Sequence, residues 1–165
     1  MIAPDGQRRG LPGVVGPDAR LLVLGSLPGD RSLAEGRYYA HPRNQFWRLI
    51  GAVLGEDLAT RDYDDRLARL AARRVGLWDI YRSAVRQGSL DTAIRDGRPN
   101  DLAGLCARLP DLRLVAFNGL KAGGGVRLLP PGVAHAVLPS SSPAHTLAYD
   151  AKLRAWQYAL CHVVD

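Results

Sequence analysis

The sequence predicts an α/β fold built on a parallel four-stranded sheet with helices on both faces. Four short apolar runs alternate with segments whose apolar residues recur at spacings of three and four, the repeat of one helix face. Such alternation is typical of parallel sheets, in which a helix joins each strand to the next. Each run ends at glycine or polar residues, and ligands of such folds bind beyond the carboxyl ends of the strands.

The apolar runs locate the predicted strands, which cover residues 20–24, 75–80, 112–117 and 134–138. Helical patterns cover residues 46–53 and 64–73. A weaker pattern over 121–129 is interrupted by three consecutive glycines, which disfavour a helix. A final helix is expected to bury Leu147, Leu153, Trp156 and Leu160.

Local signals indicate where these elements begin. Asn44 precedes the first helical pattern, and Asn100 is expected to cap a helix that stops at Pro110. Residues 1–17 are rich in glycine and proline, so we expect a loosely ordered N-terminal segment. Residues 18–165 then form one domain, the usual organisation for a chain of 165 residues.

Composition excludes several classes of protein. Hydrophobic residues make up 47% of the chain, which argues against a disordered polypeptide. No apolar run approaches the roughly 20 residues of a membrane helix, and the N-terminus lacks a signal-peptide core, so we expect a cytoplasmic protein. The net charge of +6 and the pI of about 9.8 modestly favour a polyanionic partner.

Cysteine and histidine patterns indicate neither a metal nor another cofactor. Cys106 and Cys161 lie on predicted helices without metal-ligand spacing. Two thiolates also do not supply the four of an ordinary iron–sulfur cluster. The histidines are scattered without a metal-site pattern, at positions His41, His135, His145 and His162.

Small and polar residues gather where the predicted strands end. Residues 25–29, Gly-Ser-Leu-Pro-Gly, form a turn without the spacing of a phosphate loop or a dinucleotide fingerprint. Residues 38–47 combine aromatic rings with basic and amide side chains, a composition that suits a flipped base and its flanking phosphate. Asn118 and the serine-rich segment 140–145 follow the last two strands.

Each of these segments also has a purely structural interpretation. Asn118 equally suits a turn, and Ser142 followed by Pro143 equally suits the start of the last helix. A helix start lined by hydroxyls is in turn a natural seat for a phosphate. The G-x-S-x-G motif of a serine hydrolase is absent. The spacing of an acid–base pair is absent among Asp30, Asp79 and Asp91.

Together these segments resemble the motifs of the uracil-DNA glycosylase superfamily. Residues 23–29 and 38–47 are similar to the G-x-N-P-G turn and the A-H-P-x-N-x-F-W block of its mismatch-specific members, and residues 138–145 resemble their DNA-intercalating loop. Most branches place Asn, Asp or Glu where this chain has Leu27. An apolar residue there is typical of the hypoxanthine-DNA glycosylase branch. The resemblance extends from about Leu21 to the end of the chain.

The resemblance implies a three-layer α/β/α sandwich without a metal, and a monofunctional DNA glycosylase of base excision repair. Hypoxanthine in deoxyinosine is the implied target, and we expect a monomer that acts on DNA carrying deaminated bases. The asparagine of the H-P-x-N block is held to be catalytic in that branch, which implies Asn44. The implied base pocket contains Gly25, Ser26, Leu27, Tyr39 and Asn118. The implied DNA contacts are Arg43, Ser140, Ser141, Ser142 and His145.

Glycosidic cleavage passes through a cation-like sugar, so a positioned water can suffice without a strong base. Asn44 is therefore predicted to orient the water or to bind the base. No lysine lies at a motif, so a Schiff-base lyase step is not expected.

Three alternatives stay open. A side-chain amide matches the adjacent carbonyl and N–H of hypoxanthine and of uracil alike, so a uracil-removing or broad enzyme is the first. The second is a DNA-binding module that senses lesions without cutting. The third is a small-molecule hydrolase on a similar scaffold.

Overall fold

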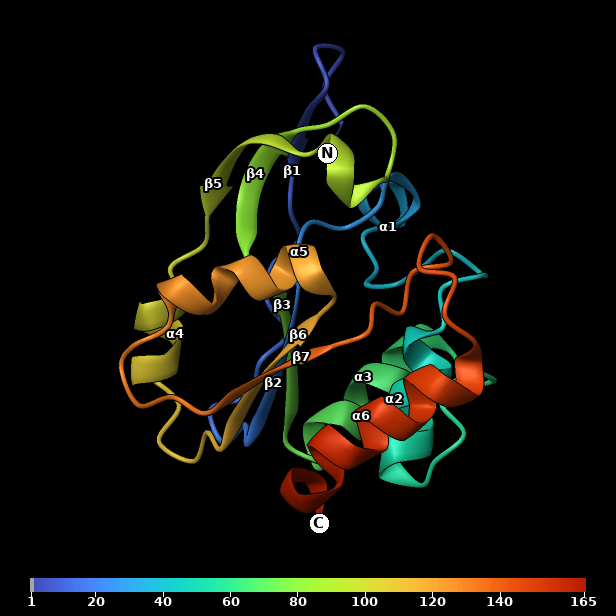
Figure 1. Ribbon diagram of the computed structural model, residues 1–165, viewed down its shortest axis with the longest axis vertical. Coiled ribbons are helices and arrows are strands. Elements are labelled where there is room, and N and C mark those ends of the chain that lie inside the picture. Colours follow the sequence, from blue (N-terminus) through green and yellow to red (C-terminus); the bar gives the residue numbers. More distant parts are fainter. Residues whose placement is uncertain (1) are drawn as a thin grey trace.

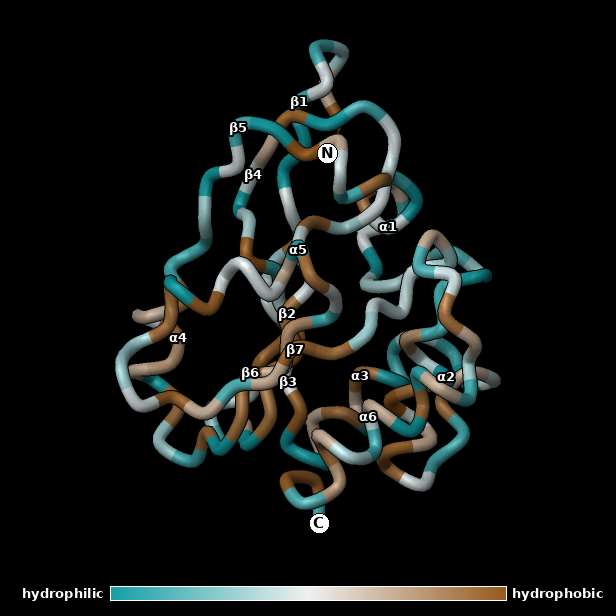
Figure 2. Tube along the Cα trace, in the orientation of Figure 1, coloured by the Kyte–Doolittle hydropathy of each residue, from teal (hydrophilic) through white to brown (hydrophobic). Residues whose placement is uncertain are grey.

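The computed structural model describes residues 2–165 and contains the predicted parallel sheet (Figure 1). Its strand order is β3-β2-β6-β7, and all neighbours are parallel. The strands are β2 (Leu21–Gly25), β3 (Val75–Asp79), β6 (Leu114–Asn118) and β7 (His135–Leu138). Figure 2 shows their apolar residues at the centre of the molecule. The prediction of a four-stranded parallel sheet is confirmed.

Helices cover both faces of this sheet, which confirms the three-layer sandwich. One face carries α2 (Phe46–Leu54), α3 (Tyr63–Ala72) and α6 (Tyr149–Val164). The other face carries α4 (Leu102–Ala107), α5 (Leu120–Gly123) and the 3-10 helix η2 (Gly124–Leu128). The last two elements replace the weak helix predicted over 121–129.

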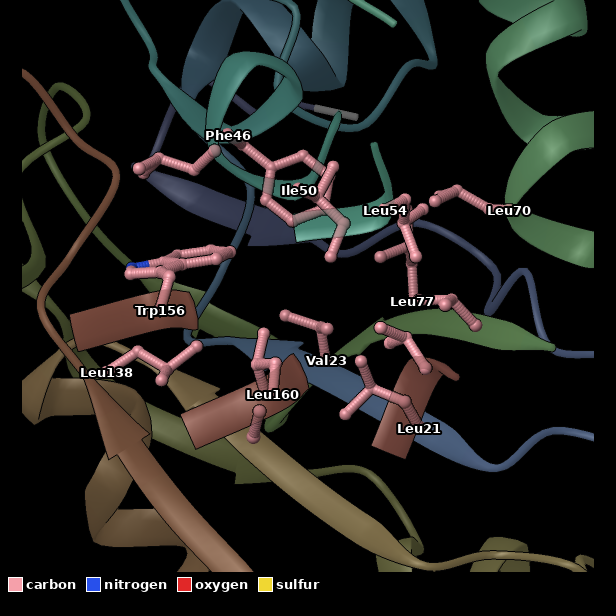
Figure 3. Packing of buried hydrophobic residues seen from close by; sticks show 14 of the residues in the cluster. Leu21, Val23, Phe46, Ile50, Leu54, Leu70, Leu77, Leu138, Trp156 and Leu160 are labelled. Atoms are coloured by element: carbon pink, nitrogen blue, oxygen red, sulfur yellow. The ribbon is translucent and has the colours of Figure 1, made fainter. Parts of the chain in front are cut away.

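The alternation of side chains along β2 divides the hydrophobic core in two. Leu21 and Val23 point toward α2 and α6, where Trp156 packs on Phe46 (Figure 3). Leu22 and Leu24 point to the opposite face and pack with α4. Every residue of β2 is buried, because successive side chains of a strand enter opposite layers.

A second sheet lies above the carboxyl ends of the main strands and was not predicted (Figure 1). Its antiparallel order is β1-β4-β5, with β1 (Gln7–Arg9), β4 (Tyr81–Val85) and β5 (Arg95–Pro99). The short helix α1 (Asp30–Glu35) and the 3-10 turn η1 (Asp91–Ala93) complete this part of the fold.

The expectation that residues 1–17 are loosely ordered is wrong for the described part of that segment. Gln7–Arg9 pair with β4, and Val14 forms a bridge with Leu77. Arg8 is buried and its guanidinium binds the Asp30 carboxylate, with Nε 2.9 Å from Oδ1. These contacts tie the N-terminal segment to the domain, and residue 1 lies outside the described part.

Two predicted helix starts are also wrong. Asp101, not Asn100, caps α4, since its Oδ1 accepts a hydrogen bond from Gly104 N at 2.9 Å. Asn100 instead donates to the backbone oxygen of Asp79. The last helix begins at Tyr149, so Ser142 lies in a loop. Asn44 lies directly before Gln45, the N-cap of α2, and its Oδ1 accepts a hydrogen bond from Phe46 N at 3.0 Å.

Candidate active site

A cleft of about 910 Å³ opens at the carboxyl ends of the main strands. It is lined by residues 25–29, 31–32, 38–39, 41, 43–44, 79, 89–92, 118–121 and 137–145. Every residue to which the sequence assigns a site role lines this cleft. The topology brings these distant segments together because the carboxyl ends of parallel strands share one edge of the sheet.

Ser141 links the two candidate asparagines. Its Oγ donates to Asn44 Oδ1 at 2.8 Å and accepts from Asn118 Nδ2 at 2.9 Å. Its backbone N–H donates to Asn118 Oδ1 at 2.9 Å. Ser141 is only 1% exposed. Its polar groups are therefore used to position the two amides, and its role as a DNA contact stays a prediction.

The hydrogen bonds of Asn44 restrict what its amide can do. Its Oδ1 accepts from both Phe46 N and Ser141 Oγ, which fills the two lone pairs of a carbonyl oxygen. Its Nδ2 has no hydrogen-bond partner among residues 2–165 and belongs to the cleft lining. Asn44 can therefore donate a hydrogen bond to a water oxygen or to a base carbonyl, but it is not arranged to accept a proton.

Asn118 is more fully committed than Asn44. Its Nδ2 donates to Ser141 Oγ and to Tyr39 Oη, at 2.9 and 3.2 Å, and its Oδ1 accepts from Ser141 N. All the polar atoms of this amide are engaged within the protein. Asn118 accordingly positions Ser141 and Tyr39, and it has no free donor, while its Oδ1 keeps one free lone pair.

Tyr39 adopts a left-handed backbone conformation, with φ of 53°. Residues other than glycine rarely adopt this backbone conformation, and it recurs at ligand-binding sites that hold a residue under strain. Its ring stacks on Phe46, with centroids 4.0 Å apart and planes inclined by 21°. Burial and the nearby Asp79 raise the pKa of its hydroxyl well above the usual value, so the phenol stays neutral. Tyr39 lines the cleft, which its predicted base-stacking role requires.

The turn at residues 25–29 is held from behind by a buried arginine. Arg86 donates to the backbone oxygens of Leu27 and Pro28 at 3.3 and 2.6 Å, and it also binds Asp30. The Leu27 side chain packs with Ala84 in a small cluster. Leu27 thus contributes backbone and shape to the cleft, as its apolar side chain predicts.

Ser26 is tied to the opposite lip of the cleft. Its Oγ donates to Asp91 Oδ1 at 2.6 Å, across 65 residues of sequence. Asp91 is the first residue of the 3-10 turn η1. Its partner lies too far away in sequence for spacing to indicate this contact.

The serine-rich loop is anchored from below by α6. Lys152 is 1% exposed, and its Nζ donates to Gln45 Oε1 at 3.0 Å and to the backbone oxygen of Ser142 at 3.2 Å. Trp156 Nε1 donates to the backbone oxygen of Pro139 at 2.9 Å. The Lys152 side chain fixes the loop and does not line the cleft.

The rim of the cleft is basic and partly apolar. Its exposed cations include Arg31, Arg43 and Lys121, and His145 lies on the same rim. Leu120 is 88% exposed at the start of α5. Ser140 and Ser142 are half-buried, and each hydroxyl accepts a backbone N–H of its own loop. A rim of this kind suits a phosphate backbone beside an unstacked base.

Asp79 is a cleft residue whose role the sequence did not indicate. It ends β3, is 4% exposed, and its Oδ2 has no hydrogen-bond partner among the described residues. Burial and the nearby Asp91 charge, opposed by Arg86, together raise the pKa of this carboxyl to about 7. An acidic residue at the end of an otherwise apolar strand was the available signal.

The buried Asp79 carboxyl should make stability fall as the pH rises. Its pKa is about 7 in the folded chain against 3.8 for an ordinary aspartate. The folded state therefore binds more protons than the unfolded state between these values, so stability is lost as the pH rises from about 3.8 to about 7. Each pKa unit corresponds to about 1.4 kcal/mol. Between these pH values we expect the free energy of unfolding of Asp79→Asn to rise by several kcal/mol relative to that of the wild type.

Urea unfolding of both proteins at several pH values between 4 and 8 measures this difference. The remaining titratable groups are common to both proteins and cancel in the comparison. A difference that stays constant across the range would contradict the expectation.

Comparisons with known proteins agree with this geometry. The sequence model of the uracil DNA glycosylase superfamily matches residues 12–161. The chain belongs to the uracil DNA glycosylase superfamily. The resemblance noted from the motifs is thus confirmed over most of the chain.

Two similar proteins come from species of Methanosarcina. A hypoxanthine DNA glycosylase of Methanosarcina acetivorans is 41% identical over 156 residues, covering 94% of this chain and 99% of the relative. A hypoxanthine DNA glycosylase of Methanosarcina barkeri is 39% identical over 154 residues, covering 93% and 98%.

A solved structure shares the fold. It is the solution NMR structure of a Methanosarcina acetivorans protein described as a candidate uracil DNA glycosylase. The TM-score is 0.86 at 40% identity, covering 95% of this chain and 98% of the other. Within residues 2–165, no group of three or more His, Cys, Asp or Glu side chains is placed to hold a metal ion. Over the same residues, no helix is both long and apolar enough to cross a membrane.

Proposed function

We propose that this protein is a monofunctional DNA glycosylase that hydrolyses the N-glycosidic bond of deoxyinosine and releases hypoxanthine from DNA. The observation that carries the proposal is the cleft in which Ser141 holds Asn44 with its amide nitrogen free. Support also comes from two relatives named for this activity, each about 40% identical over nearly the whole chain. Such an enzyme begins base excision repair of deaminated adenine.

The chemistry requires little of the protein beyond orientation. Cleavage of a glycosidic bond builds positive charge on the sugar, so water can attack once it is placed beneath the reacting carbon. The free Nδ2 of Asn44 can hold that water by its oxygen, or can donate to the departing base as negative charge develops on it. Neither role needs proton transfer to Asn44.

The rim would hold the DNA. Arg43, His145 and the hydroxyls of Ser140 and Ser142 lie around the opening and suit contacts with phosphates beside the flipped nucleotide. Tyr39 lies deeper, and stacking of a base on an aromatic ring contributes roughly 1–3 kcal/mol. We infer that the protein acts as a monomer, since one chain contributes all of these groups.

A base-release assay tests the proposal. Matched duplexes carry deoxyinosine or deoxyuridine, and each is incubated with the wild type and then treated with alkali to cut abasic sites. We expect release of hypoxanthine, with strand cleavage only after alkali. Preferential release of uracil would support the uracil-removing alternative, and lesion binding without release would support the non-catalytic one.

Salt dependence distinguishes the third alternative. Binding through phosphates releases counterions, so the affinity for DNA should fall steeply between 50 and 200 mM salt. A protein that hydrolyses a small molecule would show no such salt-dependent affinity for DNA.

A further inference from the structure

Asp79 lies at the floor of the cleft, where the main sheet leaves room for it. Its register partner in β2 is Gly25. A Cβ placed on Gly25 would lie 2.5 Å from Asp79 Oδ1 and 3.2 Å from Tyr39 Oη. The Asp79 carboxyl and the Tyr39 hydroxyl therefore both reach the space that the missing side chain leaves open. This arrangement places a carboxyl directly beside the predicted base-stacking ring.

The Asp79 carboxyl is not used by the protein itself. Its Oδ2 is buried without a hydrogen-bond partner among residues 2–165. Arg86, whose positive charge acts on this carboxyl, donates its hydrogen bonds elsewhere, to Leu27, Pro28, Gly88 and Asp30. A buried polar group without a partner costs free energy, and such groups concentrate where a ligand completes them. Because Asp79 lines the cleft, a ligand bound there can supply the missing contact.

Neither candidate asparagine can by itself read both halves of a base edge. Asn118 has a free lone pair on Oδ1 but no free donor, and Asn44 has a free donor but no free acceptor. Hypoxanthine presents a carbonyl oxygen next to a ring N–H, so its recognition needs a donor and an acceptor side by side. A neutral carboxyl carries both on one group.

We propose that Asp79, in its neutral form, binds the adjacent carbonyl and N–H of the flipped base and so selects bases that carry this lactam edge. The inference rests on the proposed glycosylase function and deepens it. The carboxyl O–H donates to the base carbonyl, and the other carboxyl oxygen accepts the ring N–H.

The surroundings of Asp79 favour the neutral form. Tyr38 and Tyr39 face it from the segment before α2 and stay uncharged, because burial raises the pKa of each hydroxyl. Asp91 of η1 adds negative charge nearby, while Arg86, which follows β4, is the opposing cation. Burial with these neighbours raises the pKa of Asp79 to about 7. A large share of the carboxyl is therefore protonated at neutral pH.

The test compares deoxyinosine with deoxynebularine in the same duplex. The purine base of deoxynebularine lacks both the carbonyl oxygen and the adjacent N–H, and it is smaller than hypoxanthine, so its rejection cannot be steric. The values of kcat and KM for each duplex are measured for the wild type, Asp79→Ala and Asp79→Asn. The asparagine variant is the matched control, because its amide keeps a donor and an acceptor but does not titrate near neutral pH.

We expect the wild type to favour hypoxanthine by about 100-fold or more, because a site built to hydrogen-bond rejects an analogue that leaves its groups unpaired. Asp79→Ala should lose most of this preference, and Asp79→Asn should keep it. The wild-type kcat/KM for deoxyinosine should fall as the pH rises through about 7, whereas that of Asp79→Asn should not. A purely structural role would move neither the preference nor the pH profile.

Two results would overturn the inference in distinguishable ways. If the wild type releases hypoxanthine and Asp79→Ala keeps the full preference over purine, Asp79 does not read the base, and the proposed function stands. If the wild type releases neither base, the proposed function fails and the inference fails with it. Thermal unfolding of Asp79→Ala verifies that any loss comes from a folded protein.

Discussion

Replacement of Asn44 by alanine is expected to slow the single-turnover release of hypoxanthine by about 10²–10³-fold, the usual cost of removing one oriented donor from an active site. The affinity for DNA should change little, because the side chain lies inside the cleft and not among the exposed cations of the rim. Rates at saturating enzyme and a separate binding titration measure the two effects.

Asn44→Asp separates donation from proton transfer. The aspartate keeps an oxygen for Phe46 N and Ser141 Oγ but replaces the free amide nitrogen by a second oxygen. If Asn44 acts by donating, this variant should be as slow as Asn44→Ala at neutral pH. An aspartate variant that matched or exceeded the wild type would instead show that this position acts on the water as a base.

Replacement of Trp156 by alanine is expected to lower the free energy of unfolding by about 3–5 kcal/mol, the range for large aromatic side chains removed from a core. Trp156 has no exposed surface and packs edge-on against Phe46, with ring centroids 6.0 Å apart (Figure 3). The cavity left behind would border α2, the helix that follows Asn44 and Gln45. Urea denaturation, monitored by far-ultraviolet circular dichroism of the backbone, measures the loss of stability.

Trp156→Phe is the control for this loss, since it retains much of the packing but removes the hydrogen bond to the backbone oxygen of Pro139. We expect it to lose less stability than the alanine variant while still loosening the loop that follows Pro139. A loss below about 1 kcal/mol for Trp156→Ala would contradict the view that this ring supports the core.

The main sheet could be predicted because its strands are continuous apolar runs, a consequence of burial on both faces. The second sheet could not. Gln7–Arg9 has no apolar alternation, and β5 is exposed throughout and contains glycine and proline. Such strands are specified by pairing with a neighbour, and pairing leaves little trace in one segment of sequence.

The candidate site was predictable as a set of segments but not as a set of contacts. The positions of Asn44 and Asn118 at strand and helix ends were clear, yet only the folded chain shows that Ser141 occupies their polar atoms. The sequence shows no acid–base partner for Asp79. Its interest lies in that same feature, since the structure surrounds it without supplying one.

The bond between Lys152 and Gln45 spans 107 residues, and the bond between Ser141 and Asn44 spans 97. As the chain leaves the ribosome, the aromatic segment and the first three main strands emerge well before either partner exists to hold them. A nascent chain can thus begin its core but cannot assemble the cleft. The cleft can therefore form only after Ser141 and Lys152 have been synthesised, because these residues hold the segment that contains Asn44 and Gln45.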